Sequence, residues 1–260
     1  MFNDKKMNKL KTSFELSRAL FVLPNAFTMA SIFCGIYAML HALEQNGSDD
    51  FYQAAIAVFF AGFFDMFDGR IARLTKTQSD FGVEFDSLAD VISFGVAPAV
   101  IVYKWALWPL GNLGIFAAFV FASCGAIRLA RHNVITNKNK SMKYFIGLPI
   151  PFGAAMLVGL VIAHYKLFDG LPVERNNIVL IIVLFVGLLM VSNIPYWTFK
   201  EFKFGLKSFL ILLLFAFCSL VLSIIFSASL SLVVFIGLYI FSGLIVYIIN
   251  FFLPSSNKTG

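Results

Sequence analysis

Apolar residues come in runs long enough to cross a membrane, separated by short polar stretches. A membrane-spanning α-helix needs about 20 apolar residues, and eight runs approach this length. They cover residues 24–43, 51–74, 84–107, 112–131, 147–166, 177–196, 207–226 and 229–252. Only the short stretch Ser-Ala-Ser (227–229) marks the junction of the last two runs, which could form one hairpin or a re-entrant pair. The pattern predicts an all-α, polytopic helical bundle.

Composition supports a membrane protein and argues against a water-soluble one. Hydrophobic residues make up 60% of the 260 residues and charged residues only 13%, too few to cover a soluble surface. The three cysteines lie in separate apolar runs without metal or disulfide spacing. The net charge of +6 is typical of basic loops facing anionic headgroups. We therefore expect membrane lipids, and no nucleic acid, as partners.

Basic residues fall almost entirely on one side of the predicted bundle. With the N-terminus in the cytoplasm, seventeen of the 20 lysines and arginines lie on the cytoplasmic side, which satisfies the positive-inside rule. The basic segment 1–20 could lie on the membrane surface or only fix the orientation. A second basic stretch, 128–143, is expected to be a cytoplasmic loop. The apolar run after the basic start lacks a convincing cleavage site, so we expect it to be retained.

Four aspartates interrupt this apolar pattern between residues 65 and 90. Asp65 and Asp68 share one helix face, and Asp86 and Asp90 share another. If residues 74–80 turn the chain, the two helices lie antiparallel and the acids converge. Carboxylates in membrane-length apolar sequence are costly and by default mark a functional site. The orientation places them at the cytoplasmic membrane edge.

The residue types around the aspartates suit metal-assisted phosphate chemistry. Two carboxylate pairs can hold two Mg²⁺ or Mn²⁺ ions, which favour oxygen ligands and can clamp a pyrophosphate. Gly69 and Gly82 leave room for a nucleotide or a neighbouring backbone, and Arg73 can bind phosphate oxygens. Asp90 can take a proton from an attacking hydroxyl. A single acid at a helix end usually caps the helix or faces solvent, but four at helical spacing do not fit that interpretation.

The spacing Asp65-x2-Asp68-Gly69-x2-Ala72-Arg73-x8-Gly82-x3-Asp86-x3-Asp90 resembles the signature of the CDP-alcohol phosphatidyltransferase family at all eight fixed positions. The resemblance implies a six-helix core, two metal ions bound by the aspartates, Asp90 as the base, and a homodimer. The chain would then be one membrane domain over 1–260, with a basic segment 1–20, a catalytic core 21–200 and a C-terminal helical extension 201–260.

Further stretches resemble the phosphatidylserine synthase branch of this family, including LPNAFTMASIFCG (23–35), DSLADVISFGVAPA (86–99), IRLARHNV (127–134), FIGLPIP (145–151) and MVSNIPYWTFK (190–200). This likeness implies transfer of a phosphatidyl group from CDP-diacylglycerol to L-serine, with release of CMP. His132 departs from it, because an aromatic such as phenylalanine is expected there. The departure puts only fine acceptor contacts in doubt.

Serine brings a carboxylate and an ammonium, so its pocket needs a cation and some acceptors. The candidates are Arg128, Arg131 and Lys143, of which we favour Arg131 because it shares a resembling block with Asn133. Each could instead only fix topology and meet lipid phosphates. Asn25, which follows Pro24, is a candidate contact to CDP-diacylglycerol or an interfacial cap.

Two other functions fit parts of the pattern. The same chemistry could use another alcohol, such as glycerol 3-phosphate or inositol phosphate, which would need a denser basic pocket. A cation transporter could also place acids in the membrane, but its acids should spread along a pathway through the bilayer.

Overall fold

The computed structural model describes residues 2–44, 48–75, 77–138, 144–169, 173, 177–197 and 228–252. The predicted span 207–226 and the predicted serine contact Lys143 lie outside the described residues. All other predicted spans contain a helix, which confirms the all-α class, although the count of six core helices plus two is not established.

Most of the described helices follow one another along the chain with few residues between them. The first half of the chain forms α1 (Phe2–Glu44), α2 (Ser48–Thr75) and a long rod that runs from α3 (Asp80–Asp90) through η1 (Val91–Val96), α4 (Ala97–Val102), η2 (Tyr103–Leu107) and η3 (Trp108–Leu110). The second half forms α5 (Asn112–Lys138), α6 (Ile150–Leu167), α7 (Asn177–Val191) and α9 (Ala228–Phe252), with two short strands, β1 (Tyr144–Ile146) and β2 (Pro195–Trp197).

Four helical segments are long and apolar enough to cross a membrane: Leu23–Glu44, Asp80–Leu110, Asn112–Ile135 and Ile150–Leu167. The chain is therefore a multi-pass membrane protein. Two shorter apolar helices, Asn177–Val191 and Val233–Ile248, accompany them. At 1.5 Å per residue, the 15 residues of α7 reach only about 22 Å, less than the hydrocarbon thickness of roughly 30 Å.

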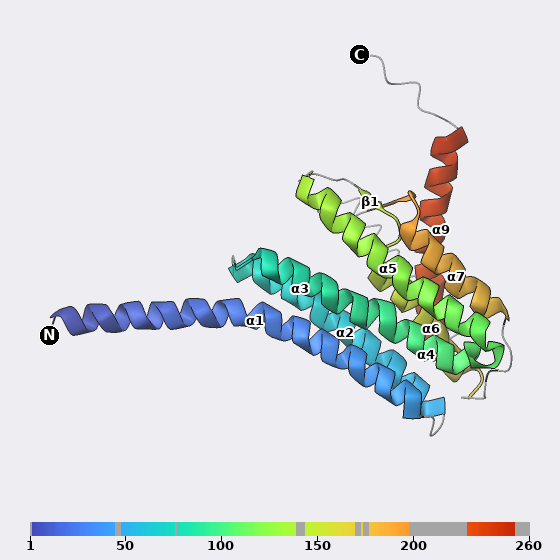
Figure 1. Ribbon diagram of the computed structural model, residues 1–260, viewed down its shortest axis with the longest axis horizontal. Coiled ribbons are helices and arrows are strands. Elements are labelled where there is room, and N and C mark those ends of the chain that lie inside the picture. Colours follow the sequence, from blue (N-terminus) through green and yellow to red (C-terminus); the bar gives the residue numbers. More distant parts are fainter. Residues whose placement is uncertain are drawn as a thin grey trace, which may run out of the picture.

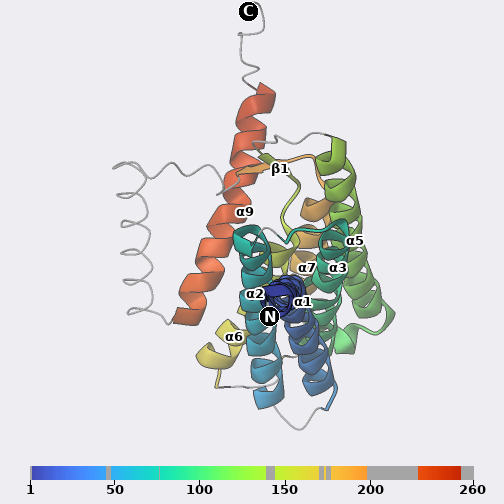
Figure 2. The same ribbon diagram turned by 90° about the vertical axis from the view of Figure 1, so that its left-hand side faces the viewer.

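The bundle is built from closely packed helix pairs. α1 lies along α2, α5 lies along α7, and α6 contacts both α2 and α9 (Figures 1 and 2). Alanines on α1 and α2 are fully buried, among them Ala38, Ala42, Ala54 and Ala61, and such small side chains let two helix backbones approach closely in a membrane. The N-terminal half of α1 projects beyond the bundle (Figure 1).

The rod that begins with α3 departs from regular α-helix at a position that the sequence does not predict. Immediately after Asp90, residues 91–96 form a π-helical turn, a feature often found at functional sites. Here Ser93 is fully buried and its hydroxyl donates to the carbonyl of Ser31 on α1 at 3.0 Å. A Cβ on Gly35 would lie 3.0 Å from the Ser93 Cα, so the glycine permits this close contact.

Two predicted boundaries are wrong. The span expected over 177–196 stops being helical at Val191, because Pro195 cannot donate a helical hydrogen bond and the chain from Pro195 pairs as β2 with β1. The stretch expected as a loop over 128–143 is helical as far as Lys138, since α5 continues past the apolar run.

Arg131 stabilises the end of α7. The last carbonyl groups of a helix have no partner within the helix, and here the guanidinium of Arg131 supplies donors. Its nitrogens donate to the Val191 carbonyl at 2.9 Å and the Ser192 carbonyl at 3.0 Å, and they reach the Ile146 carbonyl of β1 at 3.2 Å. One side chain of α5 thus joins the C-terminal end of α7 to the strand pair.

Gly147 allows the chain to turn from β1 into α6. Its φ is +79°, a conformation that favours glycine, and a Cβ there would lie 2.1 Å from the Met190 carbonyl oxygen. Gly111 also has a positive φ, +57°, but nothing lies within 4 Å of its Cβ position.

We predict that Gly147→Ala lowers the melting temperature of the purified protein in detergent more than Gly111→Ala does. A side chain is strained at the positive φ of either glycine, but only a Cβ at Gly147 also collides with a neighbouring backbone, the Met190 carbonyl. Equal melting temperatures for the two variants would contradict the tight contact between Gly147 and α7.

Candidate active site

The aspartates lie on the helical hairpin that the sequence predicts. α2 ends at Thr75 and α3 begins at Asp80. The N-terminus of α3 is capped by Ser79, whose hydroxyl oxygen accepts a hydrogen bond from the backbone N–H of Gly82 at 3.1 Å. This turn sets the end of α2 beside the start of α3, so acids 18 or more residues apart in sequence face one another.

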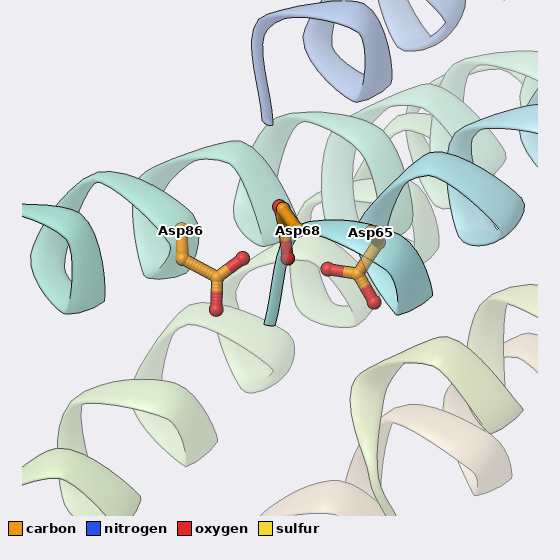
Figure 3. Close-up of side chains that lie close together, drawn as sticks. All are labelled: Asp65, Asp68 and Asp86. Atoms are coloured by element: carbon orange, nitrogen blue, oxygen red, sulfur yellow. The ribbon is translucent and has the colours of Figure 1, made fainter. Parts of the chain in front are cut away.

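Three of the four carboxylates form a compact group. One oxygen each from Asp65, Asp68 and Asp86 lies within 4.8 Å of the others, and the side chains converge from α2 and α3 (Figure 3). Asp68 is only 5% exposed. The Thr28 hydroxyl on α1 donates to an Asp68 carboxylate oxygen at 2.8 Å, so a third helix fixes the orientation of this acid.

Asp90 extends the group one helical turn deeper into the bundle. Its carboxylate interacts electrostatically with Asp65 and Asp86, and the guanidinium of Arg128 on α5 provides an opposing positive charge. Arg128 is itself 5% exposed. Thus an arginine from a different helix partly offsets the repulsion among the acids.

The cluster of aspartate carboxylates fits a divalent metal site. The Oδ1 atoms of Asp86 and Asp90 are buried without a hydrogen-bond partner in the protein, and an unpaired buried carboxylate oxygen is costly. Mg²⁺ and Mn²⁺ prefer such oxygen ligands. The set supplies enough ligand oxygens for such ions, while the identity and number of the ions stay a prediction.

A cavity of about 210 Å³ opens on the α1 side of the acids. Gly82 faces it, and a Cβ there would lie 3.2 Å from the Ser79 hydroxyl and 3.9 Å from the Asn25 amide oxygen, so a larger residue would crowd this wall. At Gly69 a Cβ would meet no atom within 4 Å and would occupy the cavity itself. The lining consists of Pro24, Asn25, Thr28, Asp68, Gly69, Ala72, Arg73, Thr77, Gln78, Ser79, Gly82, Val83 and Asp86.

A second cavity, of about 530 Å³, lies on the α5 and α6 side. Its lining consists of Asp65, Met66, Asp68, Gly69, Arg70, Arg73, Val83, Asp86, Ser87, Asp90, Arg128, Leu129, His132, Asn133, Pro149 and Pro151. Asp68 and Asp86 line both cavities, together with Gly69 and Arg73. The two cavities therefore meet at the cluster of aspartate carboxylates.

The structure separates the predicted serine contacts. Arg128 lines the larger cavity, whereas Arg131 does not and is instead bonded to the end of α7. Two residues escaped the sequence analysis. Thr28 could have been found, because it lies one helical turn after Asn25. Ser87, which accepts a hydrogen bond from the Asn133 amide nitrogen at 2.9 Å, carries no comparable signal.

Comparison with known proteins agrees with this geometry. A CDP-diacylglycerol–serine O-phosphatidyltransferase of Helicobacter pylori strain 26695 is 42% identical over 227 residues, 87% of this chain and 91% of that protein. Proteins of the same name from Methanocaldococcus jannaschii and Bacillus subtilis are 38% and 35% identical over 69% of this chain, covering 75% and 92% of their own lengths. The profile of the CDP-alcohol phosphatidyltransferase family matches residues 21–255. The chain belongs to that family.

Proposed function

We propose that this protein is a phosphatidylserine synthase, which transfers the phosphatidyl group of CDP-diacylglycerol to the hydroxyl of L-serine and releases CMP. The observation that carries this proposal is the pair of cavities that meet at Asp68 and Asp86. A transferase needs separate places for donor and acceptor that join at the reacting phosphorus. The names of the three relatives support serine as the acceptor.

The smaller cavity suits the CDP part of the donor. Arg73 provides a planar cation for phosphate oxygens, Asn25 provides an amide, and the absent side chains of Gly69 and Gly82 leave space for the nucleotide. The diacylglycerol chains would enter sideways from the bilayer. Many side chains on the outer faces of α1 and α2 are apolar and exposed, including Phe33, Leu40 and Phe63, as expected beside lipid.

The larger cavity suits serine. Arg128 is the described cation that lines it from α5, and its guanidinium can bind the serine carboxylate while also facing Asp90. Asn133 and Ser87 supply oxygen acceptors for the ammonium group. We therefore assign the carboxylate contact to Arg128 and a positioning role to Arg131.

Each residue of the site has its own role in the transfer reaction. Asp90 takes the proton from the serine hydroxyl, whose oxygen then attacks the phosphorus that bears diacylglycerol. A new P–O bond forms, the P–O bond to the CMP phosphate breaks, and CMP leaves with the bridging oxygen. Two Mg²⁺ or Mn²⁺ ions bound by Asp65, Asp68, Asp86 and Asp90 would neutralise the pyrophosphate charge. Thr28 keeps Asp68 oriented throughout.

Orientation and assembly complete the proposal. The lysine and arginine distribution favours an N-terminus and an active site on the cytoplasmic side, and the prokaryotic sources of the relatives favour a prokaryotic cell membrane. Family resemblance favours a homodimer. The described carboxylates gather around one hairpin turn rather than along a path through the bundle, which argues against a cation transporter.

The direct test uses purified protein with CDP-diacylglycerol and Mn²⁺ or Mg²⁺. Serine, glycerol 3-phosphate and inositol phosphate are offered in parallel, and CMP release and the lipid product are measured. We expect metal-dependent CMP release with serine, accompanied by phosphatidylserine. Release of CMP only with another acceptor would refute serine as the acceptor. No release of CMP with any acceptor would refute the transferase activity.

Asp90→Asn tests the base. We expect turnover to fall about 10²- to 10⁴-fold, the usual contribution of a general base, while the Kd for CDP-diacylglycerol stays close to that of the wild type. The matched control is Asp80→Asn, which changes an exposed acid on the same helix and should leave turnover unchanged. Near-normal turnover in Asp90→Asn would show that another group accepts the proton.

A further inference from the structure

A hydrogen bond joins α3 to α5 at the larger cavity. The Asn133 amide nitrogen of α5 donates to the Ser87 hydroxyl oxygen of α3 at 2.9 Å, and both residues line that cavity. Among the described residues, α3 packs mainly against α1 and η1 rather than against α5. This hydrogen bond is therefore a specific link between the two helices and not a by-product of close helix packing.

The polar hydrogens of this pair are all directed at α3. The Ser87 hydroxyl donates its one hydrogen to the Val83 carbonyl at 3.0 Å. The Asn133 amide nitrogen has two hydrogens, and it reaches a carboxylate oxygen of Glu84 at 3.5 Å in addition to Ser87. A carboxylate only accepts hydrogen bonds, and the hydrogen of Ser87 is already donated to Val83. These partners therefore fix the amide with its nitrogen, and not its oxygen, toward α3.

The pair can offer a ligand only hydrogen-bond acceptors. The Ser87 oxygen keeps one lone pair, and the Asn133 amide oxygen keeps two, whereas neither group has a hydrogen left to donate. An ammonium group donates hydrogen bonds and accepts none. A phosphate or a carboxylate only accepts them. The pair thus suits a cationic amine and offers no hydrogen bond to an anion.

The pair lies next to the arginine of the same cavity. Asn133 follows Arg128 by five residues on α5, and Ser87 precedes Asp90 by three residues on α3. With a rise of 1.5 Å per residue, these separations correspond to about 7.5 Å and about 4.5 Å along the two helices. The cavity therefore presents a cation at one level and hydrogen-bond acceptors at a neighbouring level, which is the pattern that a zwitterionic amino acid needs.

We propose that the hydrogen-bonded pair Asn133–Ser87 determines the acceptor specificity, because it recognises the amine of an amino alcohol and disfavours alcohols that carry a phosphate and no amine. The proposal deepens the proposed function and rests on it, since it assumes that the acceptor occupies the larger cavity. Of the two cavities, both residues line only the larger one. The affinity for CDP-diacylglycerol should therefore not depend on them.

Ser87→Ala tests the pair by removing one acceptor oxygen. Two competitors of serine in phosphatidylserine formation each keep one of its charged groups: ethanolamine has the amine and 3-hydroxypropionate has the carboxylate. We expect the KM for serine and the inhibition constant of ethanolamine to rise about threefold to tenfold, the effect of losing one hydrogen bond. The inhibition constant of 3-hydroxypropionate and the KM for CDP-diacylglycerol should stay unchanged. Ser87→Thr keeps the hydroxyl and should keep all four wild-type constants.

The matched control is Ser242→Ala. Ser242 is an exposed serine of α9 whose hydroxyl also donates to a carbonyl of its own helix, that of Tyr239, at 2.7 Å. This variant should leave all four constants unchanged. If Ser87→Ala changes none of them, or raises the inhibition constant of 3-hydroxypropionate as much as that of ethanolamine, the pair does not recognise the amine and the proposal is wrong.

Asn133→Ala tests the same hydrogen bond from the other helix. We expect the same pattern of constants, and we expect the double variant Ser87→Ala/Asn133→Ala to raise the KM for serine by less than the product of the two single effects, because losing either partner already breaks the hydrogen bond. Fully multiplicative effects would contradict a joint role of the pair. A wild-type protein that makes no phosphatidylserine would instead refute the proposed function, so the two failures are distinguishable.

Discussion

The mutual repulsion of four carboxylates inside an apolar bundle is the constraint on which this structure depends. Desolvation makes each of these charges costly, and their proximity adds repulsion. Two features of the protein offset this cost in part, namely the hydroxyl of Thr28 on Asp68 and the positive charge of Arg128 near Asp90. The remaining cost is the reason that the site suits divalent cations and, with them, an anionic pyrophosphate.

The helices around the site hold these carboxylates close together in spite of their repulsion. α1 supplies Thr28, α5 supplies Arg128, and the closely packed π-helical turn after Asp90 anchors the rod against α1. Arg131 also helps to hold the site in place, although it does not contact the carboxylates. By joining α7 to β1 it fixes the chain just before Pro149 and Pro151, which line the larger cavity.

Much of this arrangement could be predicted from the sequence, because it depends on local patterns. Spacing alone placed the aspartates on a helical hairpin, and hydropathy placed the helices. The roles of Arg128 and Arg131 could not be separated in this way. The two arginines lie three residues apart on one helix. Which guanidinium donates to backbone carbonyls depends on where the C-terminal end of α7, at Val191, lies in the folded protein.

The central claim is that the converging aspartates hold metal ions for the reaction, and Mn²⁺ binding tests it most directly. We would count bound ions by electron paramagnetic resonance on purified protein with saturating CDP. The account predicts about two ions per chain, a loss of binding in Asp65→Asn and Asp86→Asn, and no loss in Glu84→Gln, an exposed acid of the same helix. Equal Mn²⁺ binding by the wild type and both aspartate variants would contradict it.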